Sequence, residues 1–220
     1  MERKIITTSD GSTTIQIVDW NEQYHSIHGA IQEAYHVFIK MGLSLYKDRD
    51  VSILEIGFGT GLNALITCIE AQKINLNVKY TGIEAYPVSL LEIKQLNYIE
   101  QLKAQTYEDL FLKMHASDWE KPIKLSPTFE LIKEQKDFMH IKNEGAYDLI
   151  YFDAFGARVQ PELWTEDIFK IMYAALNKNG VLVTYAAKGS VRRAMLAVGF
   201  TVERLEGPPG KREMLRATKK

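Results

Sequence analysis

Three glycines at alternate positions follow a short apolar run and an acid in the segment Val51–Asn63, which reads VSILEIGFGTGLN. The apolar run is typical of a buried parallel strand, and the residues after Gly61 are typical of the start of a helix. Glycine suits a tight turn that a ligand approaches closely, and the amide groups of a helix N-terminus point at such a ligand. The segment predicts a nucleotide-cofactor loop in an open α/β sheet, with an ordinary strand-to-helix turn as the alternative.

Two acids follow later apolar segments. Glu84 comes directly after Val78–Ile83, where an acid in a doubly wound fold accepts hydrogen bonds from the ribose hydroxyls of the cofactor. Asp153 follows Tyr147–Phe152, and strand carboxyl ends line the ligand crevice of such folds. We therefore expect Asp153 near the cofactor, where its carboxylate would orient an amine substrate. The alternatives are a solvated surface acid for Glu84 and a turn cap for Asp153.

Aromatic residues accompany these acids. Phe155 and Trp164 follow Asp153, and their rings would stack on a nucleic-acid base unless they belong to the core. Tyr24 and His25 precede the first expected helix, and a substrate contact and a capping role both stay open for His25.

Basic residues gather toward the end of the chain: Lys188, Arg192, Arg193, Lys211, Arg212, Arg216, Lys219 and Lys220. Lys188 and Arg192 follow a predicted strand on the crevice side. Such residues either form a solvated face or contact phosphates. The formal net charge of -1 gives no global basic field, so nucleic-acid binding would depend on a local patch.

Strands and helices alternate along most of the chain. A turn-rich start with a hairpin around Asp10 and a helix over Ile31–Leu45 precede this alternation. We predict strands over Val51–Ile56, Val78–Ile83, Phe129–Lys133, Tyr147–Phe152, Val181–Tyr185, Thr201–Leu205 and Glu213–Ala217, with Ile123–Leu125 as a hairpin partner. The helices are predicted over Gly61–Lys73, Val88–Leu96, Glu166–Leu176 and Ser190–Val198. This order indicates an α/β, doubly wound, mainly parallel seven-stranded sheet with one antiparallel edge strand.

Length and composition limit the number of domains and the cellular compartment. The 220 residues suit one domain at 47–220 with an N-terminal extension at 1–46, and 46% of them are hydrophobic. The single cysteine, Cys68, falls among apolar helix residues, where we expect a core position. We expect a cytoplasmic protein, because no signal-peptide core or membrane-length run is visible. No His/Cys cluster has metal-ligand spacing, so we expect no metal.

The GxGxG loop led by Glu55 resembles motif I of S-adenosylmethionine (SAM) methyltransferases. Further motifs extend along nearly the whole chain, and together they resemble the methyltransferase domain of MnmC-type tRNA-modifying enzymes in its stand-alone form, without the oxidase domain. The matching segments are DGS at 10–12, YHSIHGA at 24–30, Glu33, HVFI at 36–39, EIGFGTGLN at 55–63, FDAF at 152–155, PELW at 161–164, VRR at 191–193, GF at 199–200 and GKREML at 210–215.

The resemblance implies a Rossmann-like class I methyltransferase fold with SAM as cofactor. It implies methylation of the amine of 5-aminomethyl-2-thiouridine at the wobble position of tRNA, read in the anticodon loop, with the amine supplied by a separate enzyme. Asp153 and Phe155 would be catalytic. Cofactor contacts would come from Glu55, Gly57, Gly59, Gly61, Asn63, Glu84, Gln135 and Asp153, and substrate contacts from Tyr24, His25, Lys188, Arg192, Arg193, Lys211 and Arg212. The family has Gly-Asp where this chain has Glu134-Gln135, so the candidates for the adenine contact are Gln135 and Asp137.

Two other functions fit parts of the pattern. The first is a SAM-type or aminopropyl-type transferase acting on a small amine, which would need no RNA. The second is a non-catalytic tRNA-binding module, against which the intact glycine loop and both strand-end acids argue. A dehydrogenase is disfavoured by GxGxG spacing in place of GxGxxG.

Overall fold

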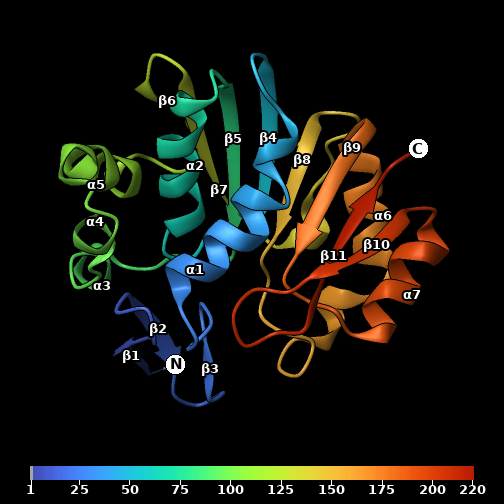
Figure 1. Cartoon of the computed structure of the whole chain (residues 1–220), viewed down its shortest axis with the longest axis horizontal. Coiled ribbons are helices and arrows are strands. Elements are labelled where there is room, and N and C mark those ends of the chain that lie inside the picture. The colour runs from blue at the N-terminus through green and yellow to red at the C-terminus, as the bar shows by residue number, and fades with distance from the viewer. Residues whose placement is uncertain (1) are drawn as a thin grey trace.

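An eight-stranded sheet forms the centre of the computed structural model, which describes residues 2–220 (Figure 1). The strand order is β10-β11-β9-β8-β4-β5-β7-β6. In chain order the strands are β4 (Asp50–Ile56), β5 (Asn77–Glu84), β6 (Ile123–Ser126), β7 (Phe129–Gln135), β8 (Tyr147–Phe152), β9 (Leu176–Thr184), β10 (Thr201–Glu206) and β11 (Glu213–Thr218).

The central strands are parallel: β4 pairs with β5 and β8, β5 pairs with β7, and β8 pairs with β9. The predicted doubly wound class is therefore confirmed. Two details differ, because the β6–β7 hairpin adds an eighth strand and antiparallel β11 lies between β9 and β10. Met214, Leu215 and Ala217 of β11 are all fully buried, whereas β10 is largely exposed. The more apolar strand thus takes the inner position.

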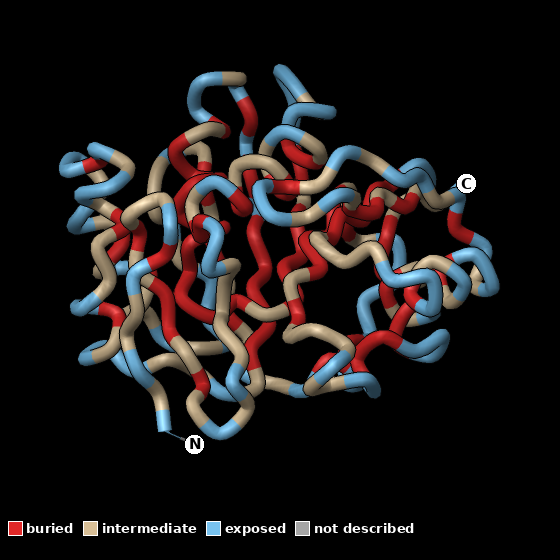
Figure 2. Tube along the Cα trace, turned by 60° about the horizontal axis from the view of Figure 1, so that its bottom comes forward, coloured by how far each residue is buried: buried red, intermediate tan, exposed pale blue. Residues whose placement is uncertain are grey.

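Helices cover both faces of the sheet. Strand side chains alternate between the faces, so that Ile53 and Tyr151 belong to one apolar cluster and Leu54 and Phe152 to the other. The first cluster includes α2 (Leu62–Lys73) and α5 (Glu108–Ala116), and the second includes α6 (Glu166–Ala175) and α7 (Gly189–Val198). Buried segments accordingly run through the middle of the molecule, with exposed loops around them (Figure 2). Cys68 is buried in the first cluster.

The N-terminal strands form a second sheet of their own. Strands β1 (Arg3–Thr7), β2 (Thr13–Ile17) and β3 (Glu22–Gln23) pair antiparallel, with the expected hairpin turn at Asp10. The helix predicted over residues 31–45 is instead α1 (Ala30–Ala34), a π-helical stretch (Tyr35–Lys40) and a 3-10 turn (Leu43–Leu45). Because this segment packs into the first cluster, the division at residue 46 stays a prediction.

The helix predicted after β5 is shorter than expected. Within the predicted range, Val88–Leu96, only α3 (Leu90–Ile93) forms, and it begins with a capping box of Ser89 and Glu92; a separate helix, α4 (Tyr98–Gln101), follows it. Asn97 separates them, because its amide accepts the Thr13 N–H at 2.8 Å and donates to the Gly11 carbonyl at 2.9 Å. These bonds draw the chain toward the β1–β2 hairpin and interrupt the helix. Within residues 2–220, no helix has the length and apolar character that crossing a membrane requires.

Candidate active site

A cavity of about 940 Å³ lies at the carboxyl ends of β4, β5, β8 and β9, and the N-terminal sheet contributes to its wall. Most of the residues expected from the sequence to form the site line it: Tyr24, His25, Gly57, Gly59, Asn63, Glu84, Asp153, Phe155, Lys188, Lys211 and Arg212. The carboxyl ends of parallel strands therefore bring these distant segments together, as the doubly wound fold requires.

The glycine loop is tied to Glu84. One oxygen of this buried carboxylate accepts the Gly59 N–H at 2.9 Å, and the other accepts the Tyr86 N–H at 2.9 Å. A carboxylate oxygen has a second lone pair, so both oxygens can still accept hydroxyl donors. Gly57 has a φ of 87°, and a Cβ there would lie 2.7 Å from the Asp153 carbonyl oxygen. The loop thus approaches the chain after β8 more closely than a larger residue permits.

Asn63 joins the cofactor loop to Asp153. Its amide nitrogen donates to Glu55 Oε1 and to Asp153 Oδ2, both at 2.9 Å. Glu55 lies behind the cavity wall and also accepts the Tyr80 hydroxyl at 2.9 Å, and burial raises its pKa well above the usual value. Glu55 therefore fixes the amide of Asn63, while Asp153 reaches the cavity.

The environment of Asp153 makes its carboxyl group basic. Burial, first of all, and the carboxylate of Glu33 raise its pKa, the Asn63 amide and the Lys211 ammonium lower it, and the net result is a pKa of about 7. At neutral pH the group can therefore both accept and release a proton.

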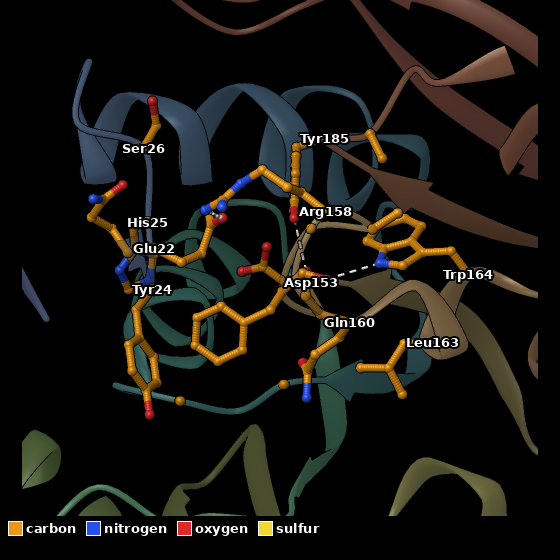
Figure 3. A pocket seen from close by; sticks show the side chains of 18 of the residues that line it. Glu22, Tyr24, His25, Ser26, Asp153, Arg158, Gln160, Leu163, Trp164 and Tyr185 are labelled. Atoms are coloured by element: carbon orange, nitrogen blue, oxygen red, sulfur yellow. Dashed lines mark hydrogen bonds and ion pairs between the residues drawn. The ribbon is translucent and has the colours of Figure 1, made fainter. Parts of the chain in front are cut away.

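Aromatic side chains form the wall beside Asp153 (Figure 3). The Phe155 ring meets Tyr24 edge to face at 5.0 Å and Trp20 at 5.7 Å between ring centroids. The Trp164 indole donates to the Phe155 carbonyl oxygen at 2.8 Å, and the Tyr185 hydroxyl donates to the Ala154 carbonyl oxygen at 2.8 Å. These contacts hold the residues after Asp153 in one conformation.

Two arginines fasten the N-terminal sheet across the cavity. Arg3 donates to the Tyr86 carbonyl oxygen at 3.0 Å, in the loop after β5. Arg158, in the loop after β8, donates to the carbonyl oxygens of Trp20 and Asn21 at 3.1 Å and pairs with Glu22 at 2.7 Å. The N-terminal sheet therefore bridges the loops after two different strands.

His25 has an internal role in this arrangement. Its Nδ1 lies 3.0 Å from the Thr14 hydroxyl, and its Nε2 lies 3.5 Å from the hydroxyl of Thr60 in the glycine loop. Burial lowers its pKa to about 4, so the imidazole is neutral at neutral pH. These contacts support positioning of the loop by His25; a direct substrate contact stays a prediction.

Five predicted site residues do not line the cavity: Glu55, Gly61, Gln135, Arg192 and Arg193. Gln135 is exposed at the end of β7, and its N–H donates to Glu120 at 2.9 Å. Asp137, the other candidate for the adenine contact, lines the cavity with Phe138 and caps the following 3-10 turn. The structure therefore favours Asp137 over Gln135 by position, because β7 extends two residues beyond the strand predicted for it.

Glu33, Arg158 and Tyr185 are among the lining residues that received no site role from the sequence. Glu33 belongs to a segment that carries the family resemblance, and that is the one available signal for it. Arg158 follows β8 and Tyr185 follows β9, so their positions after parallel strands could have identified both as site residues.

The residues present fit a SAM cofactor. Asn63 Oδ1 is buried and has no hydrogen-bond partner within residues 2–220, so a cofactor donor group would satisfy it. Gly61 is the N-cap residue of α2, and the first turn of this helix carries no side-chain cap in the described part of the chain. Amide donors at this helix end suit an anionic group. In residues 2–220, no cluster of three or more His, Cys, Asp or Glu side chains is placed to hold a metal ion.

Comparisons with known proteins identify the family of the chain. Residues 93–220 match the model of a family described as S-adenosyl-L-methionine-dependent methyltransferase. The chain is 27% identical to the tRNA 5-methylaminomethyl-2-thiouridine biosynthesis bifunctional protein MnmC of Pseudoalteromonas translucida, over 92% of this chain and 34% of that protein. It is 28% identical to the uncharacterized protein MJ0670 of Methanocaldococcus jannaschii, over 99% of this chain and 60% of that protein. The chain thus spans about a third of the length of the MnmC relative.

Solved structures give the same result. The crystal structure of MnmC2 from Aquifex aeolicus matches with a TM-score of 0.80 and 26% identity, covering 100% of this chain and 70% of that one. A spermidine synthase matches with a TM-score of 0.62 and 17% identity over 99% of this chain and 70% of that one, which shows a shared fold alone. The resemblance to the methyltransferase part of MnmC, inferred from the sequence motifs, is confirmed. The chain belongs to the S-adenosyl-L-methionine-dependent methyltransferase family and is an enzyme that uses SAM.

Proposed function

We propose that the protein methylates the amine of 5-aminomethyl-2-thiouridine at the wobble position of tRNA, giving 5-methylaminomethyl-2-thiouridine. The observation that carries this proposal is Asp153, a basic carboxyl group in a cavity with aromatic walls beside the cofactor loop. The relatives support it, because a protein named for biosynthesis of this nucleoside aligns over 92% of the chain.

Asp153 is proposed to orient the amine and take its proton. A free alkylamine is mostly protonated at neutral pH, and only the neutral form has a lone pair to donate. When bound, SAM supplies a sulfonium-linked methyl group, which the nitrogen takes with release of S-adenosylhomocysteine and one proton. A carboxyl group with a pKa of about 7 suits a proton acceptor near neutral pH. General-base assistance of this kind contributes roughly 10²–10⁴-fold to a rate.

The other lining residues are proposed to place cofactor and base. Glu84 would accept the ribose hydroxyls, Asn63 Oδ1 would accept a donor group of the cofactor, and Asp137 would contact the adenine. Phe155 would stack on the wobble base, because its ring is held by Tyr24 and Trp20.

Phosphate contacts are proposed at the cavity rim. Lys188 and Arg212 are exposed and line the cavity mouth, so they can reach a backbone whose base enters the site. Because the substrate already carries an amine, a separate enzyme that generates a primary amine at this position would act first.

Methyl transfer from isotope-labelled SAM to different acceptors tests the acceptor class. We expect label in tRNA that carries the aminomethyl group, and none in the same tRNA after its amine has been acetylated. Label in polyamines or other free amines at a comparable rate would instead support a small-amine transferase. No transfer to any acceptor, with SAM binding measured separately, would contradict the proposal.

A further inference from the structure

Glu33 and Lys211 form an ion pair inside the cavity, although 178 positions separate them in the sequence. Glu33, on α1, is 7% exposed, and its Oε1 contacts Lys211 Nζ. Its Oε2 accepts the Ser26 N–H at 2.9 Å. Both carboxylate oxygens thus have partners, as a buried charge requires.

The loop between β10 and β11 directs Lys211 inward. Gly210 has a φ of 81°, and a Cβ there would collide with the imidazole of His28. The Lys211 N–H donates to the Pro208 carbonyl oxygen at 2.9 Å, and its ammonium lies 3.9 Å from the Tyr185 ring centroid. Lys211 is therefore held by backbone, ring and carboxylate together. A direct substrate contact for Lys211, which the resemblance implies, stays a prediction.

Asp153 experiences both charges of the pair. The Glu33 carboxylate raises the pKa of Asp153 and the Lys211 ammonium lowers it. Other groups also face Asp153: Glu55 from β4, Tyr80 from β5 and Tyr185 after β9. Burial raises the pKa of all three, so their neutral forms are favoured and the Glu33–Lys211 pair supplies the main nearby charge.

We propose that the ion pair between Glu33 and Lys211 sets the charge around Asp153 so that the substrate amine reacts in its neutral form. Lys211 neutralises Glu33, and an incoming amine therefore meets one carboxylate, that of Asp153, instead of two. Without Lys211, Glu33 would be an unpaired buried carboxylate and would hold the substrate as an ammonium ion. That complex forms readily but has no lone pair to donate. The proposal rests on the proposed function, because it requires an amine acceptor.

Charge-neutral variants of the two residues test the pair. We would measure kcat and KM for aminomethyl tRNA against pH, at saturating SAM, for wild type, Lys211→Met, Glu33→Gln and the double variant. Lys170→Met is the matched control, because it removes a lysine from an exposed ion pair on α6. Thermal melts would confirm that each variant folds. Lys211→Arg keeps the charge, so its pH profile should remain close to that of wild type.

The two single variants should act in opposite directions. In Lys211→Met the acid limb of kcat should move to higher pH by about one unit, making the enzyme about tenfold slower on that limb, while KM does not rise. In Glu33→Gln the unpaired ammonium repels a protonated amine, so the limb should move to lower pH and KM should rise. The double variant should return toward wild type. Acid limbs of kcat that superimpose for wild type and both single variants would overturn the proposal. A double variant whose acid limb lies no closer to that of wild type than the limb of Lys211→Met would overturn it as well.

A measurement without tRNA separates this inference from the proposed function. The titration midpoint of the Asp153 carboxyl carbon can be followed by ¹³C NMR, with Asp153→Asn giving its assignment. The midpoint should rise in Lys211→Met and fall in Glu33→Gln. Midpoints that do not move apart would overturn the inference whatever the acceptor is. Failure of the wild type to methylate any amine would instead overturn the proposed function.

Discussion

The amide nitrogen of Asn63 lies 2.9 Å from Asp153 Oδ2 and donates a hydrogen bond to it. Asn63 belongs to the first turn of α2, which follows the glycine loop, and Asp153 follows β8. One side chain thus connects the segment that would hold the cofactor with the carboxyl group that would meet the amine. Because the same amide also binds Glu55, its orientation is set from behind the cavity.

Asp153→Asn should abolish proton acceptance while keeping the hydrogen bond from Asn63, because an amide oxygen can accept it. We expect kcat to fall by roughly 10²–10⁴-fold with little change in SAM affinity. Single-turnover kinetics with saturating SAM and tRNA would measure this. Wild-type turnover in the variant would exclude an essential carboxylate.

The same substitution has a predicted effect on stability. The pKa of Asp153 is about 7 in the folded protein, against 3.8 for an ordinary aspartate, so the folded state binds the proton more tightly. The resulting stability is present at low pH and is lost as the pH rises to about 7. Asp153→Asn should therefore raise the melting temperature relative to wild type at about pH 8 and much less at about pH 4. Equal differences at both pH values would contradict a raised pKa.

Glu84→Gln should weaken SAM binding. The substitution keeps the size of the side chain but removes its negative charge, which strengthens the hydrogen bonds from the proposed ribose donors, and hydrogen bonds to charged groups contribute about 1.5–3 kcal/mol. The NH2 group of the glutamine also cannot accept one of the two backbone N–H groups, of Gly59 and Tyr86, that the carboxylate accepts. The dissociation constant for SAM should therefore increase at least about tenfold by calorimetry. Glu166→Gln, at an exposed position on α6, is the matched control. Unchanged affinity in Glu84→Gln would remove the ribose assignment.

Arg158→Met should loosen the N-terminal sheet from the loop after β8. The variant loses the bonds to Trp20, Asn21 and Glu22 together, and hydrogen exchange should accelerate in residues 19–23. The Arg158 side chain is exposed and its Glu22 partner only partly buried, so overall stability should change by about 1 kcal/mol or less. Methyl transfer should slow, because Phe155 loses its support from Trp20. Arg204→Met, which removes an exposed arginine paired with Glu213, should alter neither property.

Neutralising basic residues at the rim should weaken tRNA binding at low salt. Removal of one phosphate-binding side chain should flatten the slope of log affinity against log salt by roughly 0.7–0.9. We expect this flatter slope for Lys188→Met and for Arg212→Met. The same measurement on the double variant Arg192→Met/Arg193→Met tests whether the face of α7 outside the cavity binds phosphates. A slope that stays constant in all of these variants would place the RNA surface elsewhere on the protein.

The sequence predicted the site residues that directly follow parallel strands. The loop from Gly57 to Gly61, Glu84 and Asp153 all follow apolar parallel strands, and those carboxyl ends necessarily meet at one edge of the sheet. The adenine contact was harder, because the choice between Gln135 and Asp137 depends on the residue at which β7 ends.

Contacts made by the N-terminal sheet could not be predicted. The pairing of Arg158 with Glu22 depends on how that sheet docks on the cavity, and the pairing of Glu33 with Lys211 depends on how α1 meets the loop between β10 and β11. Neither spacing nor periodicity contains this information. The inner position of β11 was also missed, although its apolar residues Met214, Leu215 and Ala217 indicate burial on both faces.

The central claim is that the methyl group reaches the wobble amine. The most direct measurement is mass spectrometry of nucleosides from aminomethyl tRNA, digested after incubation with the protein and SAM. We predict that 5-aminomethyl-2-thiouridine is converted to its methylaminomethyl form, with the other nucleosides unchanged. Methylation of a different nucleoside, or an unchanged digest from a protein that binds SAM, would contradict the account.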